Sequence, residues 1–193
     1  MVKIGKANGV TLIELLVAMA VIAILMACLA STWVAYDKSF TTQAVAASVQ
    51  QTLRAALELM SDDIRMAGFD PTETADAGIV AFTGINLQFT SDRNANGSID
   101  ESDTERITYA YDAANQRLVQ ILYESTPSED QRTLIDNVTD FAFIYLDADG
   151  VFTADVELIR RIIISITVQE PAGRGTPVER TLSAEVACRN LGL

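Results

Sequence analysis

The stretch GVTLIELLVAMAVIAIL, residues 9–25, opens a long apolar run with one acid, Glu14, close to its start. No charged side chain follows between residues 15 and 36. About 20 apolar residues suffice to cross a bilayer as a helix, so the sequence predicts one transmembrane span here. A charge inside a bilayer costs several kcal/mol, and an acid that is kept there is a candidate functional residue with a positive partner.

The charges that flank the span predict its orientation. Lys3 and Lys6 precede it, whereas Asp37 and Lys38 behind it cancel each other. Because positive residues favour the cytoplasmic side, we expect a cytoplasmic N-terminus and a body on the other side of the membrane. The alternative is an ordinary secretory signal, cut at the small residues between positions 27 and 31.

The helix is expected to run well beyond the membrane span. Residues 11–66 contain neither proline nor glycine, and a continuous helix of that length would reach about 84 Å. Residues 10–36 would form its transmembrane part, and residues 37–67 an amphipathic part. In the second part, apolar residues recur at three- and four-residue steps and mark one face that should pack on a domain: Val45, Val49, Leu53, Ala56, Leu57, Met60 and Ile64.

Residues 68–193 have the texture of a β-rich domain. Short β-type runs alternate with turn residues, which predicts an antiparallel sheet packed on the helix and hence an α+β fold. Turns are expected at residues 112–116 and 149–150, and an exposed loop at 171–177. The candidate strands lie within residues 84–92, 105–112, 117–125, 138–147, 157–170 and 178–188.

The N-terminal stretch resembles the class III signal of type IV pilins and type II secretion pseudopilins. Gly9 is followed by Val10, Thr11, two apolar residues and Glu14, and then by the long apolar helix. In that family a membrane peptidase cuts after the glycine and methylates the new N-terminus. The resemblance implies a cleaved leader of residues 1–9 and a methylated Val10, where most members have phenylalanine.

The resemblance also implies a role for Glu14 in assembly. In pilins the glutamate at the fifth mature position is thought to meet the N-terminal amine of a neighbouring subunit as helices bundle into a filament. Such a pairing would give the buried acid the positive partner that it needs. The alternative is an incidental acid that reaches the membrane interface by extending its side chain.

Two further stretches resemble the PilW/PulJ-type group of minor pilins: LMSDDIRMAGFDP, residues 59–71, and RTLSAEVACRN, residues 180–190. The resemblance implies a type IV pilin-like fold and a minor pilin that primes or caps a type IV pilus. Expected partners are other minor and major pilins or pseudopilins, prepilin peptidase and the inner-membrane assembly platform. Two alternatives stay open: a J-type pseudopilin of a type II secretion system, and a membrane-tethered calcium- or ligand-binding module that never polymerises.

Composition argues against two functional classes. Residues 67–193 hold 21 acids against 9 arginines and no lysine, so direct binding of nucleic acid is not expected. The chain has no histidine, and after removal of the leader its only lysine is Lys38. These absences remove the commonest general base and any Ser-Lys dyad in the body, so we expect no enzyme. Cys28 and Cys188 should lie too far apart for a disulfide.

One acidic segment, residues 92–103, fits the pattern of a calcium loop. Gly97 stands at the sharp turn, and Ile99 takes the apolar eighth position. The flanks read as strands, so this would be an EF-like loop on a β scaffold; the alternative is a polar hairpin turn of the same residue types. The candidate ligands of Ca²⁺ are Asp92, Asn94, Asn96, Ser98 through its backbone carbonyl, Asp100 and Asp103.

Overall fold

The computed structural model describes residues 9–100, 104–124, 126–173 and 175–191. One helix, α1 (Leu12–Arg65), is followed by eight strands and a short 3-10 helix, η1 (Val156–Leu158). The strands are β1 (Ile79–Phe82), β2 (Asn86–Thr90), β3 (Arg106–Asp112), β4 (Arg117–Leu122), β5 (Asp130–Ile135), β6 (Val138–Leu146), β7 (Arg161–Glu170) and β8 (Val178–Ala187).

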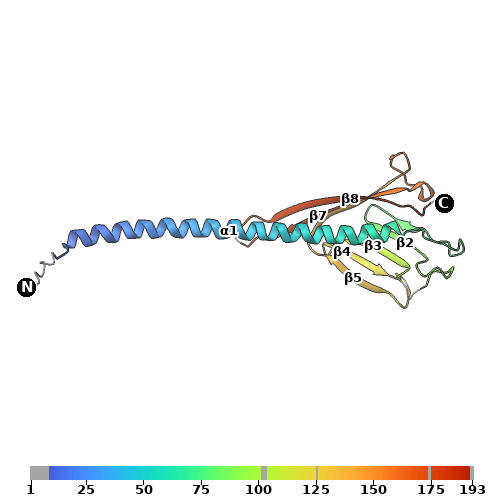
Figure 1. Cartoon of the computed structure of the whole chain (residues 1–193), viewed down its shortest axis with the longest axis horizontal. Coiled ribbons are helices and arrows are strands. Elements are labelled where there is room, and N and C mark those ends of the chain that lie inside the picture. Colours follow the sequence, from blue (N-terminus) through green and yellow to red (C-terminus); the bar gives the residue numbers. More distant parts are fainter. Residues whose placement is uncertain (1–8, 101–103, 125, 174, 192–193) are drawn as a thin grey trace, which may run out of the picture.

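Helix α1 is continuous, as the absence of proline and glycine predicts. Its 54 residues span about 81 Å, and its first half projects away from the domain (Figure 1). The second half packs along β8, with further contacts to β7 and β5. The predicted apolar face is confirmed, because six of its seven members are buried and Val45 is partly buried against the core.

The strands form two antiparallel sheets rather than a single one. The first has the order β1-β2-β3-β4-β5 and the second the order β6-β7-β8. Every neighbouring pair is antiparallel, so the predicted α+β class is confirmed. All six candidate strands are present, and the structure adds β1 and β5.

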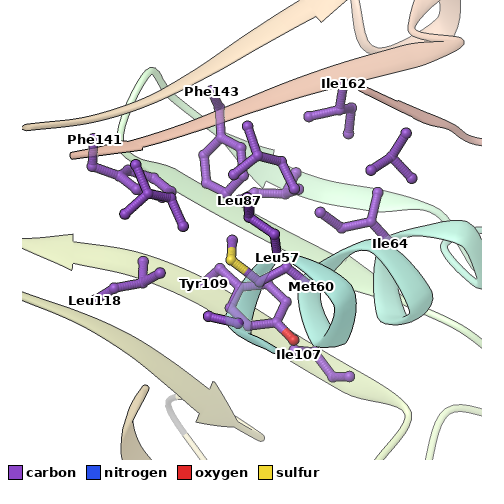
Figure 2. Close-up of a cluster of buried hydrophobic side chains, with 14 of the residues drawn as sticks. Leu57, Met60, Ile64, Leu87, Ile107, Tyr109, Leu118, Phe141, Phe143 and Ile162 are labelled. Carbon is purple, nitrogen blue, oxygen red and sulfur yellow. The ribbon is translucent and has the colours of Figure 1, made fainter. Parts of the chain in front are cut away.

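One core lies between α1 and the inner faces of both sheets (Figure 2). Leu53, Met60 and Ile64 on the helix are fully buried, and full burial of such a side chain stabilises by about 1.5–3 kcal/mol. On the second sheet, strict alternation turns one side of each strand inward. The inward residues are Phe141, Phe143 and Tyr145 on β6 and Ile162, Ile164 and Ile166 on β7.

A polar cluster inside this core ties α1 to the first sheet. The carboxylate of Asp63 accepts hydrogen bonds from the Tyr109 hydroxyl at 2.6 Å, the Arg93 guanidinium at 2.8 Å and the Gln120 amide at 3.2 Å. Burial, with the Asp63 charge beside it, raises the pKa of Tyr109 above its usual value. Tyr109 therefore stays protonated and donates to Asp63.

The two stretches that resemble minor pilins meet where α1 ends. The Asn190 side-chain amide donates to the Arg65 carbonyl at 3.1 Å, and the Gly68 amide donates to the Thr90 carbonyl at 3.0 Å. Gly68 has φ +78°, and a Cβ added there would lie 2.7 Å from the Leu191 side chain. A left-handed backbone and close packing together require glycine at this position.

The two cysteines are both free thiols, as their positions predict. Cys28 is exposed on the apolar half of α1, and Cys188 is buried directly after β8. Burial raises the pKa of the Cys188 thiol to about 11, so little reactive thiolate forms near neutral pH.

Candidate processing and assembly site

The start of α1 is fixed by a contact between Thr11 and Glu14. Thr11 is the N-cap, with an extended backbone, and its hydroxyl accepts the Glu14 amide at 3.3 Å. The Glu14 carboxylate in turn accepts the Thr11 amide at 2.9 Å and the Thr11 hydroxyl at 2.8 Å. This is a capping box, which satisfies two amide donors that a helix start otherwise leaves unpaired.

Gly9 and Val10, the predicted processing residues, lie outside the helix. Both are exposed, and the Val10 side chain is 76% accessible. Apart from the neighbours of Gly9 in the chain, no atom of the described residues lies within 4 Å of the place where a Cβ on Gly9 would stand. The Gly9–Val10 peptide bond therefore sits in an open, non-helical segment directly before the capping box, where a protease can reach it.

Glu14 has no positive partner within the described residues. The ion pairs formed there all belong to arginines in the body or near the end of α1, the first of them being Arg65. Lys3 and Lys6 lie outside the described residues. The capping box satisfies the Glu14 carboxylate through hydrogen bonds, but no basic side chain of the described residues pairs with its charge. An acid that is kept in an apolar environment needs a positive partner.

The first half of α1 is an uncovered apolar surface. All residues from 9 to 40 are exposed, including Leu12, Ile22 and Trp33. Within the described residues, α1 is also the one helix long and apolar enough to cross a membrane. Water is an unfavourable environment for such a surface, which needs either lipid or other apolar helices around it.

The predicted calcium loop connects β2 to β3. Asp92 is fully buried, and its carboxylate oxygens accept the backbone amides of Asn96 at 3.1 Å and Gly97 at 2.9 Å. The side-chain amides of Asn94 and Asn96 both donate to the Asp100 carboxylate. The structure thus brings Asn94, Asn96 and Asp100 together, while Asp92 organises the turn beneath them.

The other two candidate ligands of Ca²⁺ are Ser98 and Asp103. The Ser98 amide and hydroxyl both donate to the Asn96 side-chain oxygen at 2.9 Å, and Asp103 lies outside the described residues. Calcium could bind at Asp100 only if the two amide nitrogens turned away from it. Within the described residues, no three acidic, histidine or cysteine side chains are grouped to hold a metal ion. Calcium binding therefore stays a prediction.

Three residues that sequence reasoning did not single out shape these two sites. Thr11 caps α1, and its spacing from Glu14 is the sequence signature of a capping box. Glu105 is fully buried and holds the loop through the backbone amides of Arg93, Asn94 and Asp100, at 2.7–3.1 Å. Arg93 reaches from the loop to Asp63 on α1.

Comparisons with known families agree with this geometry. The family model described as "Prokaryotic N-terminal methylation motif" matches residues 4–28, which include Gly9, Val10 and Glu14. The family model described as "Prepilin peptidase-dependent protein B" matches residues 42–188, well over half of the chain. No curated protein and no solved structure matches the chain. The chain is a type IV pilin-like protein with an N-terminal methylation motif, and it belongs to the prepilin peptidase-dependent protein B family.

Proposed function

We propose that this pilin-like protein is a minor pilin that primes or caps a type IV pilus after cleavage behind Gly9. The observation that carries the proposal is the uncovered apolar half of α1, with Glu14 in its first turn and no basic partner for Glu14 among the described residues. Several such helices can cover one another's apolar surfaces. Cleavage creates an α-amine on Val10 of each chain, which supplies the missing positive charge for Glu14 of a neighbour.

The proposed path begins in the inner membrane. The N-terminus lies in the cytoplasm, the apolar half of α1 crosses the bilayer and the β-rich domain faces the periplasm. The assembly platform then moves the subunit into the pilus together with other pilins. The role is structural, because pilin-like families typically consist of structural subunits and the chain has no histidine to serve as a general base.

The mature N-terminus tests this proposal. Mass spectrometry of the protein from its native membrane should find a chain that begins with a methylated Val10. A Gly9→Leu variant should stay uncut, and since no atom lies within 4 Å of a Cβ there, the loss would reflect recognition by the peptidase and not misfolding. An intact Met1, or a cut near Ser31, would favour a membrane-tethered or secreted module that does not polymerise.

A J-type pseudopilin of a type II secretion system is the second candidate, since the same helix and processing segment would serve it. We favour the pilus because the stretch IRMAGF, residues 64–69, resembles minor pilins. The pilin-like subunits that co-purify with the mature protein distinguish the two. Recovery with sheared pili supports the pilus, whereas recovery with secretion pseudopilins alone supports the second candidate.

Calcium binding at the β2–β3 loop is a separate proposal, supported by the placement of the Asn94 and Asn96 side chains beside the Asp100 carboxylate. The two side-chain amides, which donate to Asp100, would have to turn their oxygens toward the ion. Calcium should raise the melting temperature of the protein, with a dissociation constant of about 0.1–1 mM as in other extracellular modules. An Asp100→Asn variant should lose this shift, whereas Asp149→Asn, in a turn of another loop, should keep it. An unchanged melting temperature at millimolar calcium would overturn the proposal that this loop binds calcium.

A further inference from the structure

The connection between β6 and β7 exposes large apolar side chains at the end of the domain farthest from the apolar first half of α1. β6 ends and β7 begins beside the end of β8, and Asn190, three residues after β8, contacts the end of α1 (Figure 1). We define the distal patch as Val151, Phe152, Val156 and Leu158. Their side chains are 61%, 66%, 39% and 51% exposed.

The backbone under the distal patch is held in place. The Asp147 amide donates to the Val151 carbonyl at 2.9 Å, and the Thr153 amide donates to the Tyr145 carbonyl at 3.0 Å. Thr153, after Phe152, and Ile159, after Leu158, are buried, and Asp155 caps η1. A surface that is already ordered loses little conformational entropy when a partner binds, so this arrangement favours docking.

The distal patch lies in an acidic stretch of the chain. The connection carries Asp147, Asp149, Asp155 and Glu157, and its one arginine, Arg160, turns its guanidinium to the carbonyls of Glu157 and Ile159. On the neighbouring strands, Arg161 pairs with Glu185 at 3.1 Å. A second copy of this chain would bring like charges together, whereas a partner with basic residues around an apolar pocket would complement them.

We infer that the distal patch docks a different pilin-like subunit, one that presents an apolar pocket for Phe152 inside a rim of lysine or arginine. The inference rests on the proposed function and deepens it, because it names the surface by which this chain holds the next subunit outward. Phe152 is the largest and most exposed of the four residues, and aromatic side chains are enriched among those that dominate interfaces.

Photo-crosslinking in the full-length protein tests the inference. Benzoylphenylalanine replaces Phe152 in cells that make the other pilin-like subunits of the assembly, and in a matched control it replaces Val80, which is 57% exposed on β1. Position 152 should form an adduct with a different pilin-like subunit, and position 80 should form none. High salt during irradiation should lower the yield, since exposed charge pairs are screened.

A second variant separates docking from general exposure. With the cross-linker at Val156, Phe152→Glu should lower the adduct yield about tenfold or more, whereas Phe152→Leu should retain most of it. An unchanged melting temperature would show that Phe152→Glu still folds. An adduct with a second copy, equal yields at positions 80 and 152, or no effect of Phe152→Glu would each overturn the inference.

The same samples distinguish failure of the docking inference from failure of the proposed function. Protein that is cut after Gly9 and built into a filament, yet forms no adduct at position 152, would overturn the docking inference alone. An uncut chain would overturn the proposed function, whatever adducts it forms.

Discussion

Replacing Glu14 with alanine should leave the protein cut after Gly9 but lower its incorporation into the assembly at least tenfold. The loss follows because the amine of a neighbouring subunit would stay unpaired among apolar helices, and removing one member of a buried ion pair costs about 3–5 kcal/mol. Incorporation is measured as the fraction of mature protein that co-purifies with sheared filaments or with other minor subunits.

The capping box requires a control, because alanine also removes the Glu14 contact with Thr11. Glutamine serves a capping box as glutamate does, but it carries no charge. Glu14→Gln should therefore fail nearly as badly as Glu14→Ala. Thr11→Ala keeps the charge and weakens the helix start by about 0.5–2 kcal/mol, so it should assemble far better. Normal assembly of Glu14→Gln would mean that the acid acts as a cap only.

Replacing Asp63 with alanine should lower the free energy of unfolding of the β-rich domain by about 2–4 kcal/mol, because two buried donors, on Tyr109 and Gln120, and the partly exposed Arg93 lose their shared acceptor. The side chain of Asp63 is 13% exposed and accepts from Arg93, Tyr109 and Gln120. Thermal or urea unfolding, followed in detergent on the full chain, measures the change.

Asp62 provides the matched control. It is the residue directly before Asp63 on α1, but its side chain is 74% exposed and pairs with Arg65 on the surface. Such a pair contributes about 0–1 kcal/mol, so Asp62→Ala should change little. Equal effects of the two variants would show that the Asp63 cluster does not secure the helix to the first sheet.

The sequence predicts α1 well because its signals are local. An apolar run, an absence of helix breakers and a stripe at three- and four-residue steps all report on neighbours along one element. Thr11 and Glu14 add a capping box that can be read from their spacing alone. The processing residues belong to this local kind of signal, so one short stretch is enough to propose them.

The arrangement of the domain was harder to predict, because it depends on contacts between distant residues. The strand β5 is not predicted from the sequence, because its residues Asp130 and Arg132 face solvent at a sheet edge and the strand shows no apolar alternation. The division into two sheets arises from pairing between strands, which single runs do not encode. Asp63 and Glu105 look like ordinary surface acids until folding places their partners around them.

The uncovered half of α1 restricts how a subunit can travel. Moving each large apolar side chain from lipid into water would cost about 1.5–3 kcal/mol, and the whole span would exceed the roughly 5–15 kcal/mol that keeps a typical domain folded. A free aqueous intermediate is therefore inaccessible. Under the proposed function, each subunit would have to exchange lipid for protein neighbours gradually, so that departure from the bilayer and entry into the fibre form one continuous event.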